Sequence, residues 1–114
     1  MARIAVDIDG VLAEKLDNGN YPEDYMNKRP LPMARESLEY LKNKGHTIIL
    51  FTARHEEDRE ITEQWLRDHG FVYDELIMGK PYFDVLIDDR AIRHTDWHLT
   101  LHTLEFLEKR GRWF

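Results

Sequence analysis

The chain has 114 residues, a formal net charge of −6 and no cysteine. This length supports one hydrophobic core but not a second, and the acidic balance argues against a protein that binds nucleic acid or anionic membranes through a basic surface. The absence of cysteine excludes a disulfide framework, a thiolate nucleophile and a thiolate metal site.

The first predicted element is a buried strand over residues 3–8, which ends in the sequence Asp7-Ile8-Asp9-Gly10. Residues 10–32, which we call the flap, are polar and turn-rich, and Asp17-Asn18-Gly19-Asn20 is their clearest turn signal. Two acids at the end of a buried strand are costly unless a cation or a shared proton offsets their repulsion. The motif therefore favours an active-site edge over a piece of core.

Strands and helices alternate along the rest of the chain. A helix is predicted to start after Pro32 and to run to about Lys44, with Leu38 and Leu41 facing inward and Gly45 ending it. The other predicted elements are strands at 47–51, 72–78 and 84–87 and helices at 56–69 and 96–110. This alternation predicts βαβ units, so we expect an α/β fold, a Rossmann-like three-layer sandwich with a mostly parallel sheet, in which residues 1–114 form a single domain.

Polar side chains follow the ends of all four predicted strands. In chain order they are Asp7 and Asp9, then Thr52-Ala53-Arg54, then Lys80, then Asp88-Asp89. Because the carboxyl ends of parallel strands share one edge, where ligands bind, these groups should converge. Each feature alone is typical of a turn, a helix cap or a solvated lysine, but their joint occurrence predicts one active site.

Phosphoryl transfer is the chemistry that fits these residues. Converging carboxylates require a cation, and an all-oxygen ligand set favours Mg²⁺. Asp7 can act as the nucleophile that forms an aspartyl-phosphate. Asp9 can act as a general acid for the leaving oxygen and then as a base for water.

The phosphate group itself needs donors and positive charge. The Thr52 hydroxyl and the Lys80 ammonium are expected to hold its non-bridging oxygens. Backbone amides around Asp9, Gly10 and Ala53 would add fixed dipoles, and Arg54 is expected to reach the distal part of the substrate.

The order and spacing of these residues resemble the four motifs of the haloacid dehalogenase (HAD) superfamily, in its phosphatase branch. The matching residues are Asp7-Ile8-Asp9-Gly10-Val11 for the first motif, Thr52 for the second, Lys80 for the third and Asp88-Asp89 for the fourth. The resemblance implies a HAD-like fold, dependence on Mg²⁺, and a metal held by the Asp7 carboxylate, the Asp9 carbonyl and Asp88. Asp89 would bind through water or orient a ligand. The acid at position 9 is implied to mark members that hydrolyse phosphate esters or move phosphate between hydroxyls.

The resemblance also indicates that this chain has no cap domain. Only 28 positions separate Thr52 from Lys80, which one helix and one strand use up, and the flap is too short for a folded cap. Members without a cap act on macromolecules or close their site with a neighbouring subunit, and the acidic balance favours the second case.

The function predicted from these residues is hydrolysis of a small phosphorylated metabolite, with a sugar phosphate preferred and nucleic acid not preferred. Thr52-Ala53-Arg54 and Ile87-Asp88-Asp89-Arg90 are similar to small members linked to bacterial polysaccharide biosynthesis, and also to the phosphatase half of polynucleotide kinase-phosphatases. A nucleotide or polynucleotide-end phosphatase and a phosphotransferase or phosphomutase are therefore alternatives. Outside enzymes, the alternatives are an inactive binding scaffold and a phospho-receiver. A receiver is disfavoured because the middle strand ends in Thr52 rather than in an acid.

The last predicted helix suggests contact between subunits. One stripe of apolar side chains should dock on the sheet, and Leu99 and Phe106 point to its other side. Together with Trp113-Phe114, this second patch predicts a homo-oligomer formed through the C-terminal helix and the flap. His94, His98 and His102 have a spacing that could hold a metal on one helix face, although a solvated face is the simpler interpretation.

The sequence also carries signals about location. No segment has the length of a membrane-spanning helix, and Met1 leads directly into a strand rather than into a signal peptide. We therefore expect a cytoplasmic protein with no membrane partner, a setting that suits a chain without cysteine.

Overall fold

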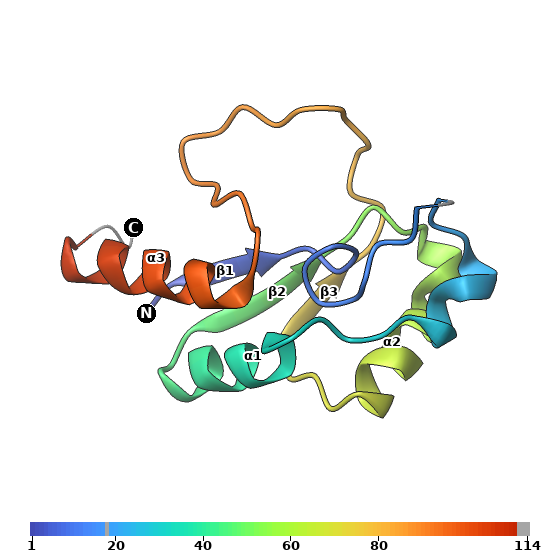
Figure 1. The fold of residues 1–114 in the computed structure, drawn as a ribbon, viewed down its shortest axis with the longest axis horizontal. Coiled ribbons are helices and arrows are strands. Elements are labelled where there is room, and N and C mark those ends of the chain that lie inside the picture. Colours follow the sequence, from blue (N-terminus) through green and yellow to red (C-terminus); the bar gives the residue numbers. More distant parts are fainter. Residues whose placement is uncertain (18, 112–114) are drawn as a thin grey trace.

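The computed structural model describes residues 1–17 and 19–111, and its centre is a parallel sheet (Figure 1). The strands, in sheet order, are β1 (Arg3–Val6), β2 (Thr47–Phe51) and β3 (Glu75–Ile77). Ala5 lies opposite Ile49, and Leu50 lies opposite Leu76. Parallel neighbours need a crossover between them, so the predicted α/β architecture with a parallel sheet is confirmed.

Helices supply the crossovers. The α-helices are α1 (Ala34–Asn43), α2 (Arg59–Asp68) and α3 (Trp97–Lys109), and short 3₁₀ helices are η1 (Pro22–Asn27) and η2 (Glu56–Asp58). The predictions for α1 and β2 are confirmed, including the inward-facing Leu38 and Leu41. The helix predicted at 56–69 begins with the separate turn η2 before α2. Asp96 caps α3 by accepting a hydrogen bond from the Leu99 N–H at 2.9 Å.

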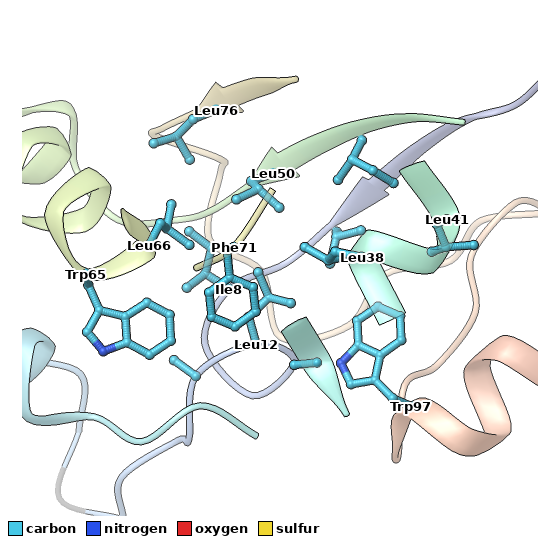
Figure 2. Packing of buried hydrophobic residues seen from close by; sticks show 14 of the residues in the cluster. Ile8, Leu12, Leu38, Leu41, Leu50, Trp65, Leu66, Phe71, Leu76 and Trp97 are labelled. Carbon is cyan, nitrogen blue, oxygen red and sulfur yellow. The ribbon is translucent and has the colours of Figure 1, made fainter. Parts of the chain in front are cut away.

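The core lies between the sheet and the helices (Figure 2). Ile48 and Leu50 are fully buried on one side of β2, among leucines of α1 and α2. Two buried indoles also tie the flap to the helices: Trp65 of α2 donates to the Lys28 carbonyl at 2.9 Å, and Trp97 of α3 donates to the Val11 carbonyl at 2.8 Å. These bonds hold the flap near the carboxyl ends of the strands.

The first strand is shorter than predicted because a tight turn follows it. The Ile8 carbonyl accepts the backbone N–H groups of Val11, Leu12 and Ala13 at 2.8–3.2 Å. Backbone groups committed to this turn cannot pair with a neighbouring strand, so β1 ends at Val6. The flap then folds back on the domain without forming a separate cap.

The prediction of a strand at residues 84–87 is wrong. These residues belong to a long connection between β3 and α3 that arches away from the sheet (Figure 1). Val85, Leu86 and Ile87 are exposed, Ile87 to 94%. An apolar run becomes a strand only where a sheet edge pairs with its backbone, and the run itself carries no information about that partner. Within residues 1–17 and 19–111 the sheet therefore has three strands.

The C-terminal helix shows the predicted two-sided pattern. Trp97 and Leu104 are buried, whereas Leu99 and Phe106 are exposed to 54% and 55%. Trp113 and Phe114 lie outside the described residues, and oligomer formation stays a prediction. In the part of the chain that the structure describes, no helix is long and apolar enough to cross a membrane.

The histidines near α3 do not assemble a metal site. The Nδ1 atom of His94 lies 2.6 Å from the Thr100 hydroxyl, and His98 and His102 are exposed. Among the described residues, no group of three or more histidine, cysteine, aspartate or glutamate side chains could hold a metal ion.

Candidate active site

Asp7 stands at the carboxyl edge of the sheet, directly after β1. Its side chain is 40% exposed, and the Lys80 Nζ lies 3.9 Å from its Oδ2. Its Oδ1 accepts the Ile8 N–H at 2.8 Å. Burial raises the pKa of Asp7, while the Lys80 charge and this hydrogen bond oppose the rise. Asp7 is thus a reachable carboxylate, and Lys80 is the ammonium that pairs with it.

Backbone hydrogen bonds bring Thr52 and Lys80 to the same edge. The Thr52 N–H donates to the Ile77 carbonyl at 3.0 Å, and the Lys80 N–H donates to the Thr52 carbonyl at 2.9 Å. These bonds join the chain after β2 to the chain after β3. The Lys80 ammonium then lies 5.3 Å from the ring centroid of Phe51. The structure therefore brings Lys80 beside Asp7 and joins its backbone to that of Thr52 at this edge.

The predicted phosphate-binding residues Thr52, Ala53 and Gly10 differ in exposure and in hydrogen bonding. Thr52 is buried, and its hydroxyl accepts the Arg54 N–H at 3.2 Å. Ala53, which the sequence assigned to phosphate binding, is exposed beside it. Gly10 adopts φ +89°, a conformation that favours glycine, and its N–H donates to the Ala13 carbonyl at 2.8 Å. The Gly10 amide is thus engaged in the turn rather than pointing unpaired at the edge.

Asp9 differs sharply from Asp7 in its surroundings. Its side chain is 11% exposed and accepts four hydrogen bonds. The Lys28 Nζ and the Arg54 Nη2 each donate to Oδ1 at 2.7 Å, and the Arg54 Nε and the Asn20 Nδ2 each donate to Oδ2 at 2.9 Å. Burial alone would raise the pKa of Asp9, but Arg54 and then Lys28 outweigh it and hold the pKa below its usual range.

The Arg54 side chain serves Asp9 rather than the open part of the edge. It is fully buried, and its Nη1 donates to the Thr62 hydroxyl at 3.1 Å. Its guanidinium also lies over the Tyr25 ring, 3.6 Å from the centroid. The sequence assigned Arg54 to the substrate, whereas here its guanidinium donors are directed at Asp9 and Thr62.

Lys28 and Asn20 are site residues that the sequence analysis missed. Lys28 carries no local signal, because a single lysine in a turn-rich segment is normally solvated. The sequence pattern places Asn20 in a turn and gives it no role at the site. Their contact with Asp9 depends on how the flap folds over the strand ends, so only the tertiary structure reveals it.

Among the described residues, Asp88 and Asp89 do not join Asp7 and Asp9 in a group that could hold a metal ion. Both are exposed on the connection that arches from the sheet, and the Asp88 Oδ1 accepts the Arg90 N–H at 3.0 Å. The carboxylates expected to bind Mg²⁺ are therefore not brought together. Asp7 is at the edge of the sheet, the Asp9 oxygens are bonded to Lys28 and Arg54, and Asp88 and Asp89 are on the connection between β3 and α3. The described donor set does not fit a magnesium ion in this arrangement.

The parallel sheet, the missing cap and the strand-end residues together define a HAD-type phosphatase domain. Residues 2–98 match the family model described as the polynucleotide kinase PNKP phosphatase domain, and the chain belongs to this family.

Solved structures agree with this assignment. A target protein from Vibrio cholerae is 32% identical, with a TM-score of 0.66 over 82% of this chain and 84% of that chain. A chain of an RNA repair complex is 25% identical, with a TM-score of 0.57 over 99% of this chain and 33% of that one. D,D-heptose 1.7-bisphosphate phosphatase from B. bronchiseptica, crystallised with magnesium and phosphate, shares the fold: it is 20% identical, with a TM-score of 0.55 over 80% of this chain and 54% of that chain.

One curated relative is similar over a shorter stretch. A candidate nucleotidase of Bacillus cereus is 43% identical over 47 residues, which are 41% of this chain. The matched stretch spans only a quarter of that relative's length, 25%.

Proposed function

We propose that this phosphatase domain hydrolyses phosphomonoesters through an aspartyl-phosphate on Asp7. The contrast between the two acids carries the proposal. Asp7 is 40% exposed and faces Lys80, whereas four donors occupy the oxygens of Asp9. Asp7 is therefore the carboxylate of the two that is free to attack phosphorus.

The reaction has two steps. In the first, Asp9, which Arg54 and Lys28 keep ionised at rest, takes up a proton from solvent; an Asp7 oxygen then bonds to phosphorus, the bond from phosphorus to the leaving oxygen breaks, and Asp9 gives that oxygen the proton. In the second, water gives a proton to Asp9 while its oxygen bonds to phosphorus, which releases the Asp7 carboxylate and inorganic phosphate.

Both steps require Asp9 to bind a proton at an oxygen that already has two hydrogen bonds. Because a carboxylate offers about four acceptor positions, one of the four donors must withdraw first. Lys28 and Arg54 are buried, whereas Asn20 is exposed. We infer that Asn20 is the donor that gives up its position when substrate enters.

The substrate we propose is a small phosphorylated metabolite, with a sugar phosphate first. The acidic chain, with a net charge of −6, supports a small substrate over a long polyanion. A second candidate is the phosphate of a nucleotide or polynucleotide end. The family match and the Bacillus cereus relative favour it, because their descriptions name a polynucleotide kinase phosphatase domain and a nucleotidase.

A substrate panel tests the function and separates the two candidates. Phosphate release is measured for hexose phosphates, nucleoside monophosphates, and oligonucleotides with a 3′- or 5′-terminal phosphate. We expect release from the sugar phosphates at the highest kcat/KM. Faster release from nucleotides or oligonucleotide ends would select the second candidate, and transfer to an added alcohol would indicate a phosphotransferase.

Mg²⁺ is part of the proposal on the strength of the resemblance alone. The same panel is therefore run with EDTA and after readdition of MgCl₂. Loss of phosphate release in EDTA and its return with MgCl₂ would support the Mg²⁺ dependence that the resemblance implies, which the described arrangement of carboxylates does not itself provide. Full activity in EDTA would remove Mg²⁺ from the proposed function without affecting the assignment of Asp7.

Lys80→Met tests the phosphate-binding role of the ammonium. Lys80 is the cation that faces Asp7, so its removal takes away charge stabilisation of the phosphoryl group in the transition state. We expect kcat/KM for the best substrate to fall by about 10²-fold, the usual effect of losing one such donor. Lys42→Met is the matched control, because Lys42 pairs with Asp74 at the surface and should leave kcat/KM unchanged. Equal rates for Lys80→Met and wild type would contradict the role.

A further inference from the structure

Lys28 is a fully buried charge in the flap. Its Nζ donates to Asp9 and to the Asn20 Oδ1. Its backbone is held separately, because the Trp65 indole donates to the Lys28 carbonyl. Burying an ammonium costs several kcal/mol before pairing, and a hydrophobic side chain of similar volume often serves stability as well. A buried lysine at an active site therefore calls for an explanation beyond packing.

Lys28 and Arg54 together hold the Asp9 carboxylate in one orientation. Arg54 approaches both Asp9 oxygens with Nη2 and Nε, the bidentate geometry that fixes a carboxylate plane. Lys28 adds a second donor to Oδ1 from the flap. Because the two cations come from different segments, Asp9 cannot turn about its side-chain bonds without breaking one of them.

Lys28 has no route to the substrate itself. Its side chain has no exposed surface, and Tyr25 and Asn20 of the flap lie around its ammonium. Any effect of Lys28 on the reaction must therefore pass through Asp9 or through the flap.

We propose that Lys28 is a positioning residue that aims the Asp9 carboxyl at the leaving oxygen of the substrate and, through its bond to the Asn20 Oδ1, holds the flap beside Asp9 when the Asn20 Nδ2 withdraws. This inference rests on the proposed hydrolysis, because it assigns Lys28 a part in proton transfer to the leaving oxygen. It differs from a packing role in what it predicts: the loss of Lys28 harms only reactions whose leaving oxygen needs a proton.

Two esters of similar size separate these roles. Benzyl phosphate releases an alkoxide that requires a proton, whereas 4-nitrophenyl phosphate releases a stable phenolate that does not. The parameter kcat/KM reports the steps up to departure of the leaving group. For Lys28→Met we expect kcat/KM to fall by about 10²-fold for benzyl phosphate, the lower range for general acid catalysis, and by less than about 3-fold for 4-nitrophenyl phosphate. Lys28→Arg should regain part of the loss because it restores a charged donor.

Controls keep the result interpretable. Arg29→Met removes the neighbouring cation, whose side chain is 85% exposed and pairs with Glu14. This variant should leave kcat/KM unchanged for both esters. If Lys28→Met does not fold, Lys28→Gln, which keeps a donor without charge, takes its place in the same comparison. Equal losses for the two esters, or no loss for benzyl phosphate in a folded variant, would overturn the proposal.

A second measurement does not depend on turnover. Because Lys28 bonds to Asn20, Lys28→Met should speed amide hydrogen exchange in residues 19–27 while leaving α1 as protected as in wild type. If wild type hydrolyses neither ester, the proposed function fails by itself and this measurement still decides the flap role. Unchanged exchange in residues 19–27 would overturn it.

Discussion

Asp7→Asn is expected to lower kcat/KM for the best phosphomonoester by at least about 10³-fold, because an amide cannot attack phosphorus to form the covalent intermediate. The assay is phosphate release under saturating and limiting substrate. Enzyme denatured during turnover should also carry phosphate on the peptide that contains Asp7 in wild type, and not in the variant. Undiminished activity of Asp7→Asn would end the nucleophile assignment.

Unfolding experiments show whether the loss is chemical. Burial raises the pKa of Asp7 in the folded protein, so the ionised side chain costs stability near neutral pH. That cost vanishes as the pH falls below the pKa of an unfolded aspartate, where both states are protonated. Asp7→Asn should therefore be at least as stable as wild type at pH 7. A large loss of stability would mean that the variant's inactivity reports unfolding instead.

Asp9→Asn is expected to lower the free energy of unfolding by about 3–5 kcal/mol at pH 7, the usual cost of removing one partner from a buried ion pair. The two cations that bind Asp9 have no exposed side-chain surface. An asparagine would also replace one acceptor oxygen by an NH₂ group, which would face the donors of Lys28 or Arg54. Denaturant unfolding of both proteins measures the difference.

The pH dependence of this difference follows from the sign of the shift. The pKa of Asp9 lies below its usual range in the folded protein, because Arg54 and Lys28 outweigh the effect of burial. Its stabilisation is therefore fully present above the pKa of an unfolded aspartate, about 3.9, and is lost as the pH falls through the lower folded-state pKa. The stability difference between wild type and Asp9→Asn should begin to shrink below about pH 3.9 and be lost only below the folded-state pKa of Asp9. Glu14→Gln, which breaks the exposed pair with Arg29, is the matched control and should have a much smaller effect.

Much of the fold was predictable because its elements carry strong local patterns. The run Thr47–Phe51 is apolar and β-branched and forms β2, and the helix after Pro32 forms α1 with Leu38 and Leu41 buried. The run at 84–87 has a similar composition but forms no strand. Composition is a local property, whereas pairing requires the backbone of another segment at the right place.

The candidate site divides in the same way. The sequence alone determined the strand-end residues Asp7, Thr52 and Lys80, because parallel strands bring their carboxyl ends to one edge whatever else the chain does. Only the tertiary structure decided the partners of Asp9, since Lys28 and Arg54 are 19 and 45 residues away along the chain. Among the described residues, it also did not bring Asp88 and Asp89 into a group with Asp7 and Asp9 that could hold a metal ion. The alternation of apolar and polar side chains that predicts a strand is a property of residues next to one another in the sequence. The counter-ions of a buried charge come from distant segments that pack against it, and no local pattern predicts which segments those are.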